Sequence, residues 1–385
     1  MQKKYRGISL FAGAGGMDVG FKKAGVHVEW ASEIDKDACN TYEANNVETI
    51  LKRGDIRETY HELRNYEGID IIFGGPPCQG FSVAGKMDPT DERSTLVWTF
   101  LDAVRIVRPK AFVIENVKAL ASLEKWKDVR EKIYRISNEM GYSCYPFLLN
   151  SADFGVPQKR ERVFFIGFAN KDFDPDKMMS RIMKKKKGPK SVRNAISHLG
   201  PAGTSKNPLT CTAKITLAAN PVMRKSPYAG MIFNGMGRPL NLDEASNTLP
   251  ASMGGNKTPI IDEELLYGKE KDDWVVQYHN NLLKKKIEPQ YSEAPKRLRR
   301  LTINEAALIQ TFPCDYIFHG SKTAIYKQIG NAVPCLLAEV VARSVIEELE
   351  NVPNNTSEPY QLSLDSLLIN KGSFVDVKDG LVTLV

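Results

Sequence analysis

One stretch, residues 70–82, constrains what this chain can fold into more than any other. Residues 69–73 form a short, mostly apolar run that predicts a buried strand. Gly-Gly-Pro-Pro at 74–77 ends it, because two prolines fix φ and cannot continue a ladder of backbone hydrogen bonds. Cys78 follows on this stiff turn, at the carboxyl end of the predicted strand, where ligands bind in open α/β sheets. The stretch predicts a placed nucleophile, and the alternative is an inert, buried cysteine.

Length and composition exclude several classes of protein. With 385 residues the chain can form one large domain or two smaller ones. Its apolar residues are not concentrated in membrane-length runs and its start shows no signal-peptide pattern, so we expect a soluble protein without a membrane contact. The six cysteines are scattered, without a CxxC or a Cys/His cluster. We therefore expect no metal site, no disulfide framework and a reducing compartment.

The chain carries a net charge of +7, and its basic residues are bunched in three clusters in its later half. The clusters are residues 184–187, 284–286 and 296–300. Such bunching predicts a surface that faces phosphates. The alternative is a set of ordinary solvated loops.

The chain opens with a strand, a glycine turn and a helix, at residues 7–11, 12–16 and 17–24. This order is typical of a nucleotide-binding α/β fold, in which the glycines let the backbone approach a ligand. Asp18 stands where the third glycine of G-x-G-x-x-G would be, so a pyrophosphate cradle is poorly supported.

Acidic residues follow the next two predicted strands, at residues 26–31 and 47–51. Glu33 lies about twenty residues after the glycine turn, where a carboxylate commonly binds ribose hydroxyls. The alternative is a carboxylate that stabilises the start of a helix over 35–42. Asp55 sits at a strand end, where it can accept a hydrogen bond from an exocyclic amine.

Strands and helices continue to alternate up to residue 167, which predicts a doubly wound, mostly parallel sheet. The remaining helices are predicted at 95–107 and 126–140, and the remaining strands at 111–114, 142–149 and 163–167. Glu115 follows one of these strands directly, so it is expected at the same sheet edge as Cys78. The polar residues 86–94 are expected to form a mobile loop over this site.

From about residue 171 the pattern changes to loops and scattered strand candidates, which predicts a smaller, irregular second domain. The strand candidates are residues 215–219, 231–234 and 274–278. A helix over 301–312 starts with a capping box of Thr302 and Glu305, and an apolar helix over 335–349 is expected to pack back on the first domain. The expected division is 1–180 completed by 322–385, with 181–321 as the second domain.

Six motifs then make a family recognisable. They are residues 11–16 (Phe-Ala-Gly-Ala-Gly-Gly), 75–79 (Gly-Pro-Pro-Cys-Gln), 115–117 (Glu-Asn-Val), 158–162 (Gln-Lys-Arg-Glu-Arg), 299–302 (Arg-Arg-Leu-Thr) and 330–333 (Gly-Asn-Ala-Val). In this order they resemble the DNA (cytosine-5)-methyltransferases of bacterial restriction–modification systems. The resemblance implies a Rossmann-like catalytic domain with a smaller target-recognition domain. It also implies methyl transfer from S-adenosyl-L-methionine (SAM) to carbon 5 of a cytosine flipped out of duplex DNA.

The resemblance assigns catalytic roles to four residues. Cys78 would add to carbon 6 of the cytosine, which makes carbon 5 able to attack the methyl group. Glu115 would hold or protonate N3, and Arg162 would bind the cytosine carbonyl oxygen and orient Glu115. Arg160 is expected to meet a phosphate or the closed loop, and the alternative for both arginines is an ion pair with Glu161 or another neighbour.

The resemblance also implies a SAM site, with Phe11 against the adenine, Glu33 on the ribose and Asp55 on the adenine amine. The full expected set is Phe11, Ala12, Gly13, Gly15, Gly16, Glu33, Ile34, Asp55, Ile56, Pro77, Leu96, Asn331 and Ala332. The family often has an aromatic residue directly after the ribose carboxylate. Here Ile34 occupies that position, so no aromatic ring is available there to stack on the adenine.

The second domain would grip double-stranded DNA, and residues 246–257 resemble the family's recognition segment, with Thr248 and Leu249 at its core. The other expected DNA contacts are Gln79, Ser82 and Arg93. The resemblance implies a cytoplasmic monomer and a cognate restriction endonuclease that acts on the same site without physical contact.

Three alternatives remain open. A cytosine-5 methyltransferase acting on RNA shares the fold, although the sizeable second domain with basic loops favours duplex DNA. A catalytically silent DNA-binding protein is disfavoured by the intact Cys78, Glu115 and Arg162. An NAD-dependent oxidoreductase is disfavoured by the missing third glycine and by the Pro-Pro-Cys turn.

Overall fold

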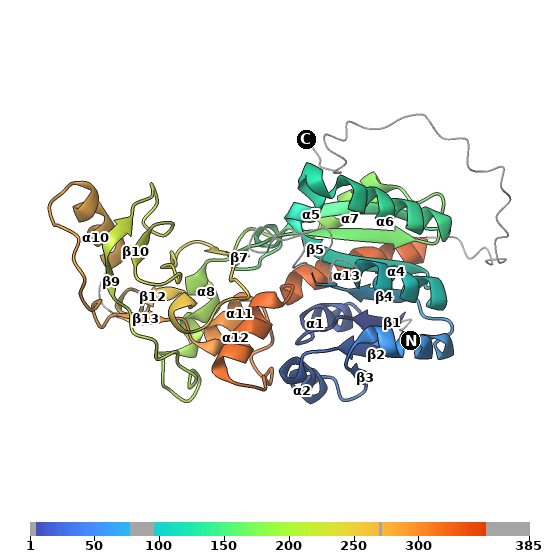
Figure 1. Ribbon diagram of the computed structural model, residues 1–385, viewed down its shortest axis with the longest axis horizontal. Helices are drawn as coiled ribbons and strands as arrows, with labels where there is room; N and C mark the ends of the chain where they lie inside the picture. Colours follow the sequence, from blue (N-terminus) through green and yellow to red (C-terminus); the bar gives the residue numbers. More distant parts are fainter. Residues whose placement is uncertain (1–4, 78–95, 269–271, 352–385) are drawn as a thin grey trace.

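The computed structural model describes residues 5–77, 96–268 and 272–351, and it has two lobes side by side along its long axis (Figure 1). One lobe holds a seven-stranded sheet with helices on both faces. The other holds α10 and the small strands β9, β10, β12 and β13, with α8, α11 and α12 on the side toward the sheet.

The large sheet has the strand order β3-β2-β1-β4-β5-β8-β6. Its strands are β1 (Tyr5–Leu10), β2 (Val26–Glu33), β3 (Ile50–Arg53), β4 (Ile71–Gly74), β5 (Ala111–Val117), β6 (Ser143–Asn150) and β8 (Glu161–Phe168). Neighbouring strands from β3 to β5 pair in parallel, and β8 pairs antiparallel with both β5 and β6. The predicted mostly parallel sheet is therefore confirmed. The strand order reverses at β1 and β4, which places a ligand crevice at their carboxyl ends.

Each face of this sheet has its own apolar core. The helices of this lobe are α1 (Gly16–Lys23), α2 (Lys36–Asn45), α3 (Ile56–Thr59), α4 (Leu96–Val107), α5 (Lys118–Ser122), α6 (Lys127–Glu139), α7 (Pro175–Met183) and α13 (Cys335–Asn351). One core joins α1, α7 and α13 to the sheet around Phe21 and Phe73, whose rings stack 3.8 Å apart. The other joins α3, α4, α5 and α6 to the sheet around Trp30, Phe100 and Trp126.

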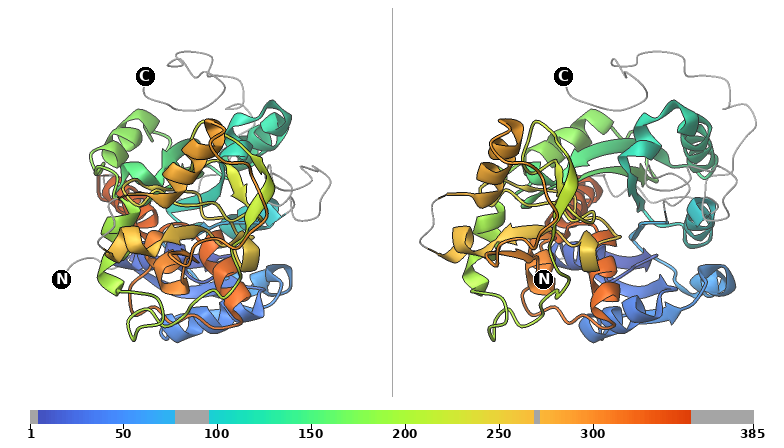
Figure 2. Two further views of the ribbon diagram at one scale, coloured as in Figure 1. Left: turned by 90° about the vertical axis from the view of Figure 1, so that its left-hand side faces the viewer. Right: turned by 60° about the vertical axis from the view of Figure 1, so that its left-hand side comes forward.

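The helix α13 returns to the sheet lobe, as predicted, and in Figures 1 and 2 it is drawn in red within that lobe. Residues 322–351 are long and apolar enough to cross a membrane by composition, but 67% of the most apolar window is buried inside the protein. Packing against α1 and α7 accounts for that apolar character.

The contact between α1 and α13 leaves no room for a side chain at Gly20. A Cβ there would lie 2.5 Å from the amide nitrogen of Glu339 and 2.6 Å from the carbonyl oxygen of Cys335. We expect Gly20→Ala to lower the free energy of unfolding by about 1–3 kcal/mol, because the two helices must separate. Urea unfolding followed by circular dichroism measures this. Gly188→Ala is the control, since nothing lies within 4 Å of a Cβ there. Equal unfolding midpoints for the two variants would contradict the close packing.

The second lobe is irregular, as expected. Its strands are β7 (Gln158–Lys159), β9 (Leu217–Val222), β10 (Met231–Phe233), β11 (Ser246–Asn247), β12 (Ile260–Asp262) and β13 (Leu298–Arg300). Its helices are α8 (Val192–Ile196), α9 (Glu263–Tyr267), α10 (Trp274–Leu283), α11 (Ile303–Ile309) and α12 (Lys322–Asn331). The capping box of Thr302 and Glu305 at the start of α11 is confirmed.

One expectation about an element needs correction, and one helix was not predicted. Residues 274–278, predicted as a strand, begin the helix α10. Asp273 caps this helix by accepting hydrogen bonds from the backbone of Val275 (2.8 Å) and Val276 (3.2 Å), and buried apolar side chains recur at helical spacing. The helix α7 was not predicted, and it runs past the expected boundary at residue 180 and packs on α13.

Candidate active site

The end of β2 is tied to the glycine turn by Glu33. Its carboxylate accepts hydrogen bonds from the backbone N–H groups of Gly13 (2.7 Å), Ile34 (2.9 Å) and Asp35 (2.8 Å). Burial raises the pKa of the Glu33 carboxyl, and the three backbone donors oppose this shift. No atom lies within 4 Å of a Cβ built on Gly13, where φ is +57°. The turn is therefore open to a ligand beside the Glu33 carboxylate.

The neighbouring side chains of the expected SAM set differ in accessibility. Ile34 is 68% exposed beside Glu33, which leaves an apolar surface at the sheet edge. Asp55 caps α3 and pairs with the Arg57 guanidinium at 2.5 Å, which lowers the pKa of the Asp55 carboxyl. Any contact of Asp55 with an amine must therefore compete with Arg57. Ile56 is only 3% exposed, so its side chain belongs to the core and only its backbone is left for a ligand.

The glycine turn packs directly on the segment that precedes α13. Phe11 follows β1 with φ 54° and packs partly against the core, while Ala12 donates its N–H to the carbonyl of Ser32. Gly15 starts α1 with φ +82°. A Cβ built on Gly16 would lie 3.0 Å from the Cβ of Ala332, so the structure brings the turn and residues 331–332 together.

Glu115 and Arg162 form a partly buried ion pair at the same edge of the sheet. The Arg162 Nε lies 2.8 Å from the Glu115 Oε1, and the side chains are 15% and 12% exposed respectively. Burial raises the pKa of the Glu115 carboxyl, while the positive charges of Arg162 and Arg160 oppose this shift. Glu115 lies within β5 rather than after it, because β5 extends to Val117 beside β8.

The Gly-Gly-Pro-Pro segment begins against this carboxylate. A Cβ built on Gly75 would lie 2.9 Å from the Glu115 Oε2, and the Asn116 side chain donates to the carbonyl of Pro76 (3.3 Å). Pro77, the last described residue before 78–95, and Leu96, the first described residue after them, are both half-buried. The expected site residues Cys78, Gln79, Ser82 and Arg93, and the expected loop 86–94, lie outside the described residues.

Arg160 does not lie where the sequence suggested. It is 2% exposed, and its guanidinium donates to the carbonyls of Leu249 (Nη1, 3.1 Å), Gly330 (Nη2, 2.9 Å) and Asn331 (Nη2, 3.3 Å). The expectation that Arg160 contacts a phosphate is wrong, because its side chain is buried among backbone carbonyls. Its role is to hold residues 249 and 330–331 together.

Of the two residues expected at the core of the recognition segment, Thr248 lies at the surface and Leu249 in the interior. Thr248 is exposed, and its hydroxyl donates to the carbonyl of Lys159 (2.9 Å). Leu249 is 1% exposed and packs in the core that contains α8, α11 and α12, so a DNA contact through its side chain is wrong for this structure. Thr248 remains at the surface as a candidate contact.

Comparisons with known proteins bear on this geometry. A family model described as C-5 cytosine-specific DNA methylase matches residues 5–347. The chain belongs to this family. It is 32% identical to the Type II methyltransferase M1.HphI of Haemophilus parahaemolyticus, covering 88% of this chain and 86% of that protein. It is also 32% identical to M.FnuDI of Fusobacterium nucleatum, covering 93% and 98% respectively.

Solved structures of other methyltransferases share the fold of this methylase. A putative DNA modification methyltransferase from an E. coli prophage has a TM-score of 0.63 at 23% identity, covering 90% of this chain and all of that one. The S. pombe Dnmt2 methyltransferase has a TM-score of 0.64 at 16% identity, covering 90% and 99%. The predicted family, methyltransferase class and fold are confirmed, together with the place of the chain among Type II restriction–modification methyltransferases.

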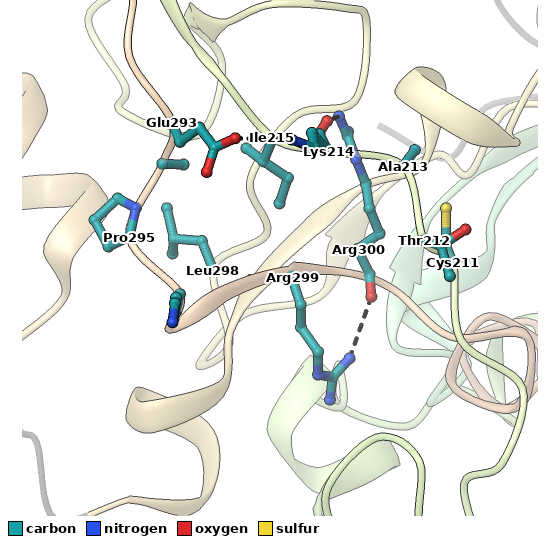
Figure 3. Close-up of a pocket in the computed structure, with 12 residues that line it drawn as sticks. Cys211, Thr212, Ala213, Lys214, Ile215, Glu293, Pro295, Leu298, Arg299 and Arg300 are labelled. Atoms are coloured by element: carbon teal, nitrogen blue, oxygen red, sulfur yellow. Dashed lines mark hydrogen bonds and ion pairs between the residues drawn. The ribbon is translucent and has the colours of Figure 1, made fainter.

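The basic cluster 296–300 of this methylase is largely structural, which corrects another expectation. Arg297 pairs with Asp262 (2.9 Å), and Arg299 pairs with Glu263 (2.8 Å) and Glu305 (2.7 Å). Arg299 and Arg300 line a cavity of about 210 Å³. Figure 3 shows both side chains among the residues that line it. Arg300 is 1% exposed and donates to backbone carbonyls, including that of residue 258 at 2.7 Å. The charges of these three arginines are engaged within the protein, whereas lysines 296 and 284–286 are exposed and remain for phosphates.

Two buried polar residues were missed from the sequence. Asp18 is fully buried, accepts hydrogen bonds from Tyr42 (2.7 Å) and Ser9 (3.0 Å), and has its pKa raised to about 6 by burial. Gln310 is fully buried at the end of α11 and bonds to other buried groups.

Proposed function

We propose that this methylase transfers the methyl group of SAM to carbon 5 of a cytosine flipped out of duplex DNA, through a covalent bond between Cys78 and the ring. The observation that carries this proposal is the Glu115–Arg162 pair with Gly75 against its carboxylate. Cys78 follows Gly75 by three residues in the sequence, and the proposal needs its thiol at the sheet edge that holds this carboxylate.

The residues around the glycine turn fit SAM. SAM carries ribose hydroxyls, a flat adenine and a sulfonium rather than phosphates, and when bound it supplies the methyl group. Glu33 offers a carboxylate for the ribose, and the open surface at Gly13 lets the cofactor approach. Ile34 offers an exposed apolar side chain for the adenine. The contacts expected from Phe11 and Asn331–Ala332 belong to the same proposal.

In this mechanism the Cys78 thiolate adds to carbon 6 of the flipped cytosine, and Glu115 supplies a proton to N3 as negative charge develops there. Arg162 holds the carbonyl oxygen and keeps Glu115 oriented. Carbon 5, now enamine-like, takes the methyl group. Loss of the proton from carbon 5 to a base then restores the double bond and expels the Cys78 thiolate, and the proton on N3 returns to Glu115.

The second lobe is proposed as the target-recognition domain. Its exposed lysines suit phosphate contacts, and Thr248 lies at the surface of the recognition segment. Flipping the base costs a few kcal/mol, which these contacts would offset. We further propose that the enzyme acts as a monomer in the cytoplasm and protects DNA from an endonuclease that shares its site.

Bisulfite sequencing of DNA from cells that express the protein tests this function. Protected cytosines within one recurring sequence are expected, and they would also reveal the target. Methyl incorporation into duplex DNA and into tRNA should be compared with the purified protein. Incorporation into tRNA alone would favour the RNA alternative and overturn the proposed substrate.

The ribose contact gives a direct test of the SAM site. Glu33→Ala is expected to weaken SAM binding by about 10- to 100-fold, since the carboxylate that would accept hydrogen bonds from the two ribose hydroxyls is lost. Glu33→Gln should lose less, because it keeps an acceptor for the backbone N–H groups. Calorimetry measures both, with the exposed Glu48→Ala as control. DNA affinity should change less than about threefold. Unchanged SAM affinity in both Glu33 variants would exclude the assigned role.

A further inference from the structure

A chain of buried side-chain amides connects the recognition segment to the turn beside the SAM site. The backbone N–H of Leu249 donates to the Gln158 Oε1 (2.9 Å), and the Gln158 Nε2 donates to the Gln310 Oε1 (2.9 Å). The Gln310 Nε2 then donates to the carbonyls of Ile329 (2.7 Å) and Ala332 (3.2 Å). Gln158 and Gln310 are both 0% exposed.

The direction of this chain is fixed from both ends. A backbone N–H can only donate, so the oxygen of Gln158 must face Leu249. Backbone carbonyls can only accept, so the nitrogen of Gln310 must face Ile329 and Ala332. With both ends assigned, the central bond between the two amides has one possible polarity. Neither amide can turn over without leaving buried groups unpaired, which is costly.

Arg160 runs parallel to this chain and joins the same two segments. It donates to the carbonyl of Leu249 and to the carbonyls of Gly330 and Asn331. Leu249 is therefore held at its N–H by Gln158 and at its carbonyl by Arg160. Direct packing reinforces this, because a Cβ on Gly330 would lie 2.3 Å from the carbonyl oxygen of residue 250.

Each end of the network reaches a functional surface. On one side Ala332 packs against Gly16 of the glycine turn. On the other side Thr248, the exposed neighbour of Leu249, lies on the recognition segment. Arg162, two residues after Arg160 on the same stretch of chain, holds Glu115. A displacement of Leu249 would therefore shift residues 329–332 and, through Ala332, the glycine turn beside the SAM site.

We propose that Gln158 and Gln310 are positioning residues that couple the seating of the recognition segment on DNA to the conformation of the SAM-side turn. This inference rests on the proposed function. If SAM and target DNA bind as proposed, each of them favours the same arrangement of residues 248–250 and 329–332. By linkage, each ligand must then raise the affinity for the other by the same factor.

The experiment measures that factor with S-adenosylhomocysteine as the probe. The full chain is titrated with a duplex that contains the target found by bisulfite sequencing, with and without saturating S-adenosylhomocysteine. For the wild type we expect the probe to raise DNA affinity by about 5-fold or more. In Gln310→Met, which fills the space without the amide, this factor should fall below about 2-fold, while each binary affinity changes less than about 3-fold. Gln158→Met should behave alike.

The exposed Glu161→Gln, on the same stretch of chain, is the matched control and should keep the wild-type factor. A merely structural role for the amides would lower both binary affinities or the unfolding midpoint without removing the coupling. The inference is overturned if either methionine variant that folds retains the wild-type factor, or if the wild type binds both ligands independently. Failure of the wild type to bind S-adenosylhomocysteine or to methylate DNA would instead overturn the proposed function.

Discussion

Replacement of Cys78 by alanine is expected to abolish methyl transfer and to leave SAM binding intact. Loss of a nucleophile that forms a covalent intermediate lowers turnover by about 10⁴-fold or more, because no other group makes carbon 5 reactive. The proposed SAM contacts of Phe11, Gly13 and Glu33 lie at the ends of β1 and β2 and not on Cys78, so calorimetry should give an affinity close to that of the wild type. Single-turnover transfer of labelled methyl groups measures the chemical step.

The exposed Cys314→Ala provides the matched control and should retain full activity. A duplex with fluorine at carbon 5 of the target cytosine gives a second readout. The mechanism needs a proton to leave that carbon, and fluorine cannot leave in this way, so the wild type should remain bonded to the DNA. Cys78→Ala should give no such adduct. Measurable turnover by this variant would remove the covalent step from the proposal.

Glu115→Gln is expected to lower the rate of methyl transfer by about 10²- to 10⁴-fold, the range for loss of a general acid. The amide cannot deliver a proton to N3, and Arg162 loses the carboxylate 2.8 Å away that orients it. The exposed Glu161→Gln on the neighbouring strand should show wild-type rates. A rate for Glu115→Gln within a few-fold of wild type would exclude proton transfer by this residue.

The pH dependence gives an independent test of the same role. Burial raises the pKa of the Glu115 carboxyl, and the protonated form is the one that can serve N3. The single-turnover rate of the wild type should therefore fall as the pH rises through this raised pKa. In Glu115→Gln that limb of the profile should disappear, since no proton is left to lose. An unchanged profile in the variant would assign the ionisation to another group.

Much of the sheet and its edge could be predicted because the signals are local. Glu33 and Glu115 stand at the ends of apolar runs, so strand pattern alone placed both carboxylates at one edge. The start of α11 was predictable because its cap lies within three residues of chain. In contrast, residues 274–278 contain two valines and two aromatic residues, which favour a strand, and the capping carboxylate of Asp273 overrides that preference.

The burial of arginines could not be predicted, because charge in a sequence does not show what a side chain contacts. Arg160 bonds to carbonyls 89 and 170 residues away in the chain. Arg299 lies six residues before its partner Glu305, but its second partner, Glu263, comes from another element. The contact between Gln158 and Gln310 could not be predicted either, because the two residues lie 152 positions apart in the sequence and meet only in the folded protein.

The dependence of the first helix on the last has a consequence for how the enzyme comes into being. Gly16 and Gly20 pack on residues 332–339, so the glycine turn proposed to bind SAM lacks this support until residue 339 has left the ribosome. At ordinary rates of synthesis this delay is on the order of tens of seconds. A chain that ends before residue 335 lacks part of this support, so we expect it not to methylate DNA.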